Sequence, residues 1–215
     1  MALDGHSANR PIDLAPSRPK ILSLDLDRFK GARSPPALAS VVTFGYLTGW
    51  RIQSEVLPLT WARVDRQTGS GRLDPGTTKN DEGRIFPYGE YLPELQAVIE
   101  TQWAVTKALE QAEGRIIPCV FHRHGRPIRD FRAAWQSACR AAGHPYRIPH
   151  DFRRTAVRNL VRAGVPEQTA MQLTGHKTRS VFDRYDIINE TDLREAVRKL
   201  GLAAGTVSGT IGQTG

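Results

Sequence analysis

Hydrophobic side chains recur every three or four residues through most of the chain between residues 36 and 200. This is the spacing of helices that bury one face against a core. It predicts a helix that begins at Pro36, a second over residues 92–114 and a third over residues 130–142. Glycines at positions 114 and 143 stand where the second and third helices should end. Most of the chain is therefore expected to be helical.

Three short segments between the first two helices have the composition of β-strands. They cover residues 62–65, 71–74 and 84–87, with turns expected at Gly69–Gly71 and Asn80–Gly83. Strands joined by tight turns pair in antiparallel order, so these three should form a meander. The predicted fold class is mainly α with a small three-stranded antiparallel sheet.

The most regular pattern lies within residues 149–200. Apolar residues recur from Phe152 to Leu160 on one face of a predicted helix, beside a stripe of arginines spaced one turn apart. Gly164 should end this helix, and Pro166 should open the next one. This stretch is expected to hold the helices nearest to any functional site.

A short helix and a last helix are predicted beyond that point. Ser180 and Asp183 have the spacing of a capping box, which predicts a short helix that would carry Tyr185. Residues 192–200 have the apolar spacing of a final amphipathic helix, and Gly201 follows them. Because this helix has one apolar face, it should pack against another surface.

The two ends of the chain lack such order. Residues 1–35 are poorly patterned and contain several prolines, and residues 201–215 are rich in glycine and threonine, as in flexible tails. The remainder, residues 36–200, is long enough to bury one core. We therefore expect one domain over residues 36–200, with an N-terminal segment and a flexible C-terminal tail.

The charge of the chain favours a polyanionic partner. Thirty Lys and Arg residues oppose 22 Asp and Glu residues, which gives a formal net charge of +8. Such an excess is typical of proteins that bind nucleic acid or an anionic membrane surface. No apolar run approaches the roughly 20 residues that span a bilayer, and no secretory signal is visible. We expect a cytoplasmic protein that does not bind membranes.

Cysteine and histidine do not indicate a metal site. Cys119 and Cys139 lack the spacing of a redox or zinc motif. His122 and His124 stand beside arginines, in a segment whose composition is that of a basic surface loop. Because no histidine or cysteine pattern has zinc-binding spacing, we expect no metal in this protein.

Candidate chemistry is concentrated in four short motifs. One is an H-x-x-R motif, and one is a Gly-His pair followed nine residues later by tyrosine. The others are an arginine at the end of Y-L-T-G-W-R and a lysine in the predicted hairpin. In kind and order these motifs resemble the catalytic domain of the tyrosine recombinases (phage-integrase family), and the resemblance covers roughly residues 36–200. The motif residues are Arg51, Lys79, His150, Arg153, His176 and Tyr185.

The resemblance implies that the protein cleaves and rejoins DNA through a 3′-phosphotyrosyl bond to Tyr185. Phosphodiester cleavage places negative charge on the nonbridging oxygens, and arginine is suited to this charge because its planar fork donates two hydrogen bonds. Arg51 and Arg153 would fill this role, with His176 as a further donor.

Two proton transfers complete the implied reaction. Free tyrosine has a pKa of about 10, so its phenol needs a base, and His150 is the nearest candidate. Lys79, in the hairpin, would act as general acid and protonate the leaving 5′ oxygen. This set of side chains is sufficient without metal, ATP or another cofactor.

One acidic position departs from the family pattern. The family commonly has glutamate three residues after the first arginine, whereas here Glu55 follows Arg51 by four. Either one residue is inserted or the loop between the helices is remodelled. We expect Glu55 to orient Arg51 without taking part in the chemistry. Basic residues next to the motifs should contact DNA, namely Arg154, Arg158, Lys177 and Arg179.

The predicted partner is double-stranded DNA, with self-association on the DNA. The predicted function is site-specific recombination or integration of a mobile element. Two alternatives are a non-catalytic DNA-binding remnant of an integrase and strand cleavage like that of a type IB topoisomerase. The family usually carries an N-terminal core-binding domain, which residues 1–35 are too short to supply. The chain is therefore expected to be a catalytic fragment or a shortened relative, monomeric off DNA and weak in duplex binding.

Overall fold

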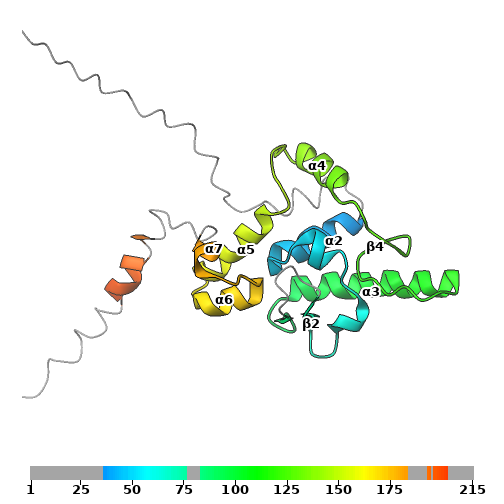
Figure 1. Ribbon diagram of the computed structural model, residues 1–215, viewed down its shortest axis with the longest axis horizontal. Helices are drawn as coiled ribbons and strands as arrows, with labels where there is room; N and C mark the ends of the chain where they lie inside the picture. The colour runs from blue at the N-terminus through cyan, green and yellow to red at the C-terminus, as the bar shows by residue number, and fades with distance from the viewer. Residues whose placement is uncertain (1–35, 77–82, 184–192, 195, 203–215) are drawn as a thin grey trace, which may run out of the picture.

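The computed structural model describes four stretches of the chain, residues 36–76, 83–183, 193–194 and 196–202. A central helix, α2 (Pro36–Thr48), packs against α3 (Pro93–Glu113) and against α5 (Asp151–Arg162) (Figure 1). Every residue of α2 from Val41 to Phe44 is buried, because helices cover it on several sides. The fold is therefore built around the first helix that the sequence predicts.

The other helices also lie where the hydrophobic pattern predicts them. Helix α3 ends at Gly114, whose left-handed conformation (φ 65°) lets its N–H bond to the carbonyl of Glu110. Helix α4 spans Arg132–Ala141, and α6 spans Glu167–Thr174 directly after Pro166. The prediction of a mainly helical domain is confirmed.

The predicted three-stranded meander is present. Strands β1 (Val64–Asp65), β2 (Ser70–Leu73) and β3 (Arg84–Pro87) pair in the order β1–β2–β3, and both pairs are antiparallel. The first strand is shorter than predicted, because Trp61–Arg63 form a 3₁₀ turn. The expected turn at Asn80–Gly83 lies largely outside the described residues, which stop at residue 76 and resume at residue 83.

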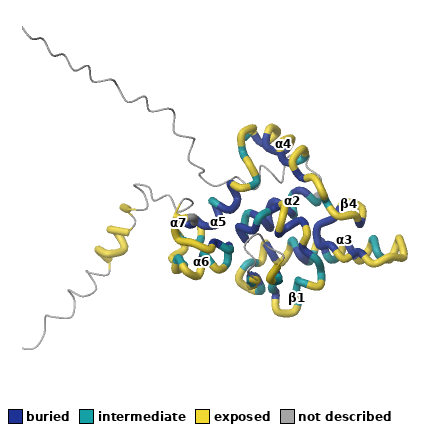
Figure 2. Tube along the Cα trace, in the orientation of Figure 1, coloured by how far each residue is buried: buried dark blue, intermediate teal, exposed yellow. Residues whose placement is uncertain are grey.

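Aromatic side chains fill the core between α2, the sheet and α5. Phe44 contacts Trp50 and Phe121 edge to face, with ring centroids 5.6 and 5.4 Å apart. Trp135 of α4 contacts Phe152 of α5 in the same way at 4.9 Å. Figure 2 shows buried residues along α2 and the facing sides of its neighbours, and exposed residues on the outer turns.

A smaller apolar cluster joins the helices that follow. It consists of Val157 of α5, Ala170 of α6 and Phe182 of α7 (Arg179–Asp183), all fully buried. Phe182 also lies edge to face against His176, with ring centroids 5.6 Å apart. The apolar contact of Phe182 thus anchors α7 beside the Gly-His motif.

Some local predictions are corrected. The short helix begins at Arg179, so Ser180 lies inside its first turn and is not its N-cap. The helical conformation of the last segment continues through Leu202, so Gly201 does not end it. Residues 122–127, which have the composition of a loop, form a hairpin of strands β4 (His122–Arg123) and β5 (Arg126–Pro127).

The last helix does not bury its apolar side chains against the rest of the described chain. Leu193, Val197 and Leu200 are each more than half exposed. Among the described helices, none is long and apolar enough to cross a membrane.

Candidate active site

Residues 48–50, which connect α2 to Arg51, are held in place by hydrogen bonds and close packing. The Thr48 hydroxyl donates to the carbonyl of Phe44, and the indole N–H of Trp50 donates to the carbonyl of Leu173 at the end of α6. Gly49 adopts a left-handed conformation (φ 68°), and a Cβ there would lie 2.8 Å from the Ala156 side chain. Close contact with α5 therefore requires glycine and fixes where Arg51 emerges.

The acidic residue that departs from the family spacing is accommodated by a π-helical turn. Residues Ile52–Val56 form this turn, with backbone bonds from Val56 to Arg51 and from Leu57 to Ile52. A π turn is wider than an α turn and takes up one extra residue. The sequence left open an insertion or a remodelled loop, and the structure has a π turn that brings Glu55 back to Arg51.

Glu55 binds Arg51 twice and a second arginine once. Its Oε2 accepts from the Arg51 backbone N–H (2.7 Å), and its Oε1 accepts from Arg51 Nη1 (2.6 Å). Arg84 Nη2 pairs with Oε2 of the same carboxylate. Burial would raise the pKa of Glu55, but the charge of Arg84 and the bonds from Arg51 outweigh it and lower the pKa. The carboxylate is therefore ionised although its side chain is fully buried.

Arg153 is buried, with 2% of its surface exposed. Its Nε donates to His176 Nε2 (3.0 Å), its Nη1 to the carbonyl of Gly49 (3.0 Å) and its Nη2 to the carbonyl of Gly175 (3.0 Å). These bonds join α5 to the end of α2 and to the end of α6. The arginine of the H-x-x-R motif is thus a fixed group at the junction of three helices.

The bonds of His176 define its protonation state. Because arginine only donates, Nε2 of His176 must be the acceptor from Arg153. On the other side, Nδ1 lies 2.8 Å from the hydroxyl of Thr174, which itself donates to the carbonyl of Ala170 (2.7 Å). The proton of the ring is therefore on Nδ1. Burial, followed by the charges of Arg153 and Arg51, lowers the pKa of His176 to about 3.

His150 lies directly before α5 and is partly exposed. Partial burial lowers its pKa, and the positive charges of Arg153, Arg154 and Arg51 lower it further. A neutral imidazole can accept a proton, which is what a general base requires. The same charges act on His176, together with that of Arg84. The structure therefore brings together four of the six motif residues, namely Arg51, His150, Arg153 and His176.

The other two motif residues, Lys79 and Tyr185, lie outside the described residues. Their neighbours in the chain are described. Asp74 and Gly83, on either side of the Lys79 segment, line a groove of about 870 Å³ between the β2–β3 hairpin and α6. This groove also includes His176 and Lys177. Tyr185 follows the buried Phe182 by three residues.

Sequence patterns did not identify Arg84 as a site residue. It is the first residue of β3, and its side chain is 7% exposed. Its guanidinium lies over the Trp50 ring, 5.5 Å from the centroid, and against Gly175. Nothing in its neighbourhood along the chain distinguishes Arg84 from the other arginines, because its partners are distant in sequence.

The residues expected to contact DNA surround the site, and some form ion pairs within the protein. Arg154 is paired with Asp151 (3.9 Å), and Arg179 is paired with Glu167 (3.1 Å). Lys177 is exposed at the groove next to His176. Of the residues that the structure describes, no three His, Cys, Asp or Glu side chains are grouped so that they could hold a metal.

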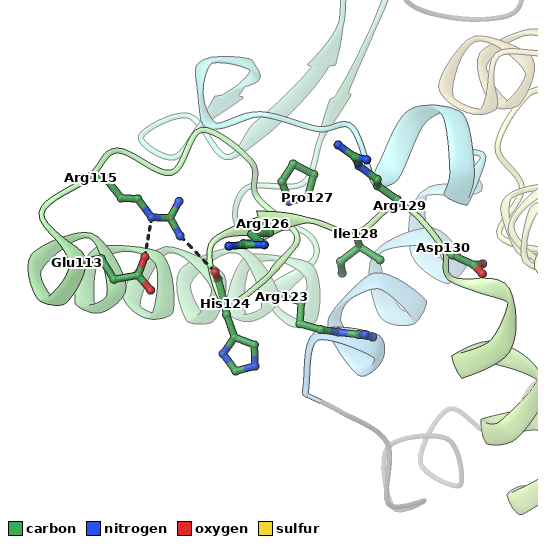
Figure 3. A pocket seen from close by; sticks show the side chains of 9 residues that line it. All are labelled: Glu113, Arg115, Arg123, His124, Arg126, Pro127, Ile128, Arg129 and Asp130. Atoms are coloured by element: carbon green, nitrogen blue, oxygen red, sulfur yellow. Dashed lines mark hydrogen bonds and ion pairs between the residues drawn. The ribbon is translucent and has the colours of Figure 1, made fainter.

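A second basic surface lies at the β4–β5 hairpin, on the opposite side of α2 from α6 (Figure 1). Figure 3 shows this pocket, of about 870 Å³, in which Arg115 is held by Glu113 and by the carbonyl of His124. No carboxylate in the described part of the chain pairs with the other three arginines of the pocket, and all three are exposed. They are Arg123, Arg126 and Arg129.

Comparison with known proteins finds a family model, a relative and solved structures that are similar to this chain. The model of the phage integrase family matches residues 29–205. The integrase of Salmonella phage P22 is 28% identical over 176 residues, which cover 79% of this chain and 44% of that protein. The chain therefore spans less than half the length of this relative.

Solved structures share the fold. XerA recombinase superposes with a TM-score of 0.68 at 23% identity, over 86% of this chain and 66% of that one. The Tn1549 transposon integrase in complex with transposon right end DNA gives a TM-score of 0.64 at 17% identity, over 86% and 68%. The arrangement of helices and sheet described above is therefore that of known recombinase catalytic domains.

Proposed function

Since the chain belongs to the phage integrase family, we propose that it catalyses site-specific cleavage and rejoining of DNA through a covalent bond to Tyr185. The observation that carries this proposal is the assembly of Arg51, His150, Arg153 and His176 around one position. In that assembly burial, followed by the fixed positive charges of the arginines, lowers the pKa of both histidines. Such a site attracts an anionic phosphate and keeps a neutral base beside it.

In the proposed step, the phenolic oxygen of Tyr185 attacks the scissile phosphorus and the bond from phosphorus to the 5′ oxygen breaks. The phenolic proton passes to His150, which is neutral because partial burial and its arginine neighbours lower its pKa. Lys79 supplies the proton to the leaving 5′ oxygen. Rejoining reverses these transfers, so the total number of phosphodiester bonds is conserved and no energy source is consumed.

The arginines neutralise the charge that develops on the nonbridging oxygens. Arg51 is suited to this because Glu55 fixes both its backbone and its guanidinium. Arg153 is held by bonds to two carbonyls and to His176, so little reorganisation is needed when phosphate binds. His176 has a proton on Nδ1 toward Thr174, so in this arrangement it acts first by orienting Arg153.

The duplex would be contacted through its phosphates on both sides of this site. Arg154, Arg158, Lys177 and Arg179 lie next to the motif residues. The exposed arginines of the β4–β5 pocket form a second positive surface, and the side chain of Gln53, two residues after Arg51, donates to the backbone carbonyl of Arg129 (2.9 Å). The partner that this surface fits is double-stranded DNA, on which copies of the protein would assemble.

Covalent capture tests the proposal. Purified protein is mixed with a nicked suicide substrate, from which the short 5′-hydroxyl strand diffuses away after cleavage. The wild-type protein should accumulate a DNA adduct that resists denaturation. Tyr185→Phe should bind the same DNA with nearly unchanged affinity and form no adduct. Tyr91→Phe is the matched control, because Tyr91 is exposed in the turn before α3.

The outcome also separates the alternatives. If the wild-type protein binds DNA without forming an adduct, it is a non-catalytic DNA-binding remnant and the proposal is wrong. If it forms adducts and relaxes supercoiled DNA without exchanging strands between two duplexes, it acts like a type IB topoisomerase. An adduct of normal yield with Tyr185→Phe would place the nucleophile elsewhere.

A further inference from the structure

Arg84 makes three contacts at the centre of the site. Its guanidinium pairs with the buried carboxylate of Glu55, lies over the Trp50 ring and touches Gly175. The Gly175 contact is so close that a Cβ at this position would overlap the guanidinium. Because the side chain is 7% exposed, its place is determined by these protein groups and not by solvent.

We propose that Arg84 is a positioning residue for DNA cleavage, which acts by holding the Glu55 carboxylate that orients Arg51. The inference rests on the proposed function, because its effect is on the rate of strand cleavage. It assigns to Arg84 a role that no motif in the sequence indicates. Arg84 itself does not need to touch the phosphate for this role.

The geometry of Glu55 explains how the effect is transmitted. Its Oε1 accepts from the Arg51 guanidinium, and its Oε2 accepts from the Arg51 backbone and also pairs with Arg84. A carboxylate that is shared in this way cannot rotate without losing one of its partners. Arg84 therefore restricts the carboxylate, and the carboxylate restricts Arg51.

Charge gives a second reason. A fully buried carboxyl group with only one cationic neighbour would favour its protonated form more strongly, because burial penalises the charge. Protonation would convert one Glu55 oxygen into a hydroxyl, which donates a hydrogen bond and is a weaker acceptor for Arg51. The positive charge of Arg84 keeps Glu55 ionised, and so keeps both of its oxygens available as acceptors.

The contact with Gly175 also connects Arg84 to Arg153, the second arginine of the site. The carbonyl of Gly175 accepts from Arg153 Nη2, while its Cα lies against the Arg84 guanidinium. Arg84 thus lies between the carboxylate that orients Arg51 and the carbonyl that orients Arg153.

The chain contains a matched control. Arg66 also pairs with a glutamate, Glu100, and also lies over an indole, that of Trp103 (4.4 Å). This arginine lies in the turn after β1 and has no contact with the motif residues that the structure describes. Arg66→Gln therefore removes the same kind of interaction outside the site.

The test compares single-turnover adduct formation and DNA affinity for Arg84→Gln, Arg84→Lys and Arg66→Gln, with thermal unfolding as a check on folding. Misplacement of a catalytic group by about 1 Å can cost roughly a hundredfold in rate. We expect Arg84→Gln to lose up to about that factor in rate and to change the dissociation constant by less than about threefold. Arg84→Lys, which keeps the charge but not the fork, should recover part of the rate, and Arg66→Gln should cleave normally.

Two further measurements identify the route of action. A methylphosphonate at the scissile position removes the negative charge that Arg51 neutralises, so the deficit of Arg84→Gln relative to wild type should shrink on this substrate. The double variant with Glu55→Gln should be no slower than the slower single variant, because both changes act on the same group. If Arg84→Gln is poorly folded, the same comparisons are made with Arg84→Lys.

Several results would overturn the inference. One is a normal cleavage rate for Arg84→Gln, or a loss of rate that is explained by a smaller folded fraction alone. Another is a rate deficit relative to wild type that stays the same on the methylphosphonate substrate. A third is a double variant with Glu55→Gln in which the two rate losses are fully additive. Failure of the proposed function itself has a different signature, since wild-type protein would then form no adduct with any substrate.

Discussion

At the scale of single residues, the site shows how one side chain sets the chemical state of another. Arg153 and His176 were both expected to donate hydrogen bonds to phosphate. In the structure, Arg153 donates to His176 Nε2, so the histidine is an acceptor with its proton on the side of Thr174. His176 therefore supports Arg153 in this state, and it must change partners before it can donate from Nε2.

The pKa of His176 leads to a prediction about stability. Its folded-state pKa is lowered to about 3, below the ordinary value of 6.5, because the ring is buried beside Arg153. Between these values only the unfolded protein binds the proton, so the free energy of unfolding should fall as the pH is lowered from about 6.5 toward 3. Denaturant unfolding at several pH values should show this slope reduced in His176→Gln.

His144→Gln is the control, because His144 lies in the α4–α5 connection outside the site. Nitrogen NMR of the wild-type ring provides a second measurement and should show a neutral tautomer with the proton on Nδ1 at pH 6. An imidazolium signal for His176 at that pH would contradict the prediction.

Lys79 gives a second prediction at this scale. We expect Lys79→Ala to slow cleavage, because the leaving 5′ oxygen then lacks a proton donor. A substrate with sulfur in place of the bridging 5′ oxygen has a leaving group that needs no proton, and it should restore the rate of this variant. It should not restore Arg153→Ala, which loses stabilisation of the nonbridging oxygens. Equal rescue of both variants, or of neither, would argue against Lys79 as the general acid.

At the scale of secondary-structure elements, the site depends on how helices end. Gly175 ends α6 in a left-handed conformation (φ 70°), so its carbonyl reaches Arg153 while its Cα leaves room for Arg84. Gly49 directly follows α2 in the same left-handed conformation, and its carbonyl also accepts a hydrogen bond from Arg153. The two helix ends thus supply the acceptors that fix one guanidinium.

Alanine at these glycines should have effects that differ by position. Gly164 is also left-handed (φ 79°), but a Cβ there meets nothing within 4 Å. Gly164→Ala should therefore cost only the backbone strain, on the order of 1 kcal/mol of unfolding free energy. Gly175→Ala must displace Arg84 as well, so it should cost more stability and also slow adduct formation by more than about tenfold.

Chemical denaturation and single-turnover cleavage on the same two variants check this prediction. The informative comparison is the cleavage rate of folded protein, which should be normal in Gly164→Ala and low in Gly175→Ala. If both variants cleave at the wild-type rate, the close approach of Arg84 to α6 is not needed for catalysis.

At the scale of the whole molecule, positive charge is distributed over two separate surfaces. One surrounds the motif residues at α5 and α6, and the other is the β4–β5 pocket on the far side of α2 (Figures 1 and 3). With a net charge of +8, binding to duplex DNA should release counterions and weaken steeply with added salt. The whole molecule is thus expected to bind DNA mainly through phosphates, with little selectivity for sequence.

Removal of the pocket arginines should reduce this salt dependence. Each of Arg123→Gln, Arg126→Gln and Arg129→Gln should lower the slope of log affinity against log salt by about one if the arginine contacts a phosphate. Titrations of a random duplex at several salt concentrations measure this slope, with Arg66→Gln as the control. An unchanged slope in the triple variant would exclude the pocket from the DNA interface. Tight, sequence-selective binding that barely depends on salt would contradict the wider expectation.

The order of residues along the chain was enough to predict most helices and strands and the kinds of side chain expected at the site. The period of apolar residues is a local property, so it predicted the helices around Phe44, Trp135 and Phe152 and the meander between them. The motifs likewise predicted the family and the residue types of the site, because their spacing is written along the chain. The ends of helices were harder to predict. Ser180 and Asp183 have the spacing of a capping box, but α7 begins at Arg179, one residue before Ser180.

How these side chains act on each other depends on contacts that form when the chain folds. Arg84 and Glu55 are 29 positions apart in the sequence, and Arg153 and Gly49 are 104 apart, so no local pattern joins them. The tautomer of His176 arises from its contact with Arg153, and the lowered pKa of Glu55 depends in part on Arg84, so both need segments that are distant in the sequence. The strength of a hydrogen bond or ion pair depends on the distance between its atoms and increases when they are buried away from water. The tautomer and the pKa shifts of the site therefore exist only once the chain is folded.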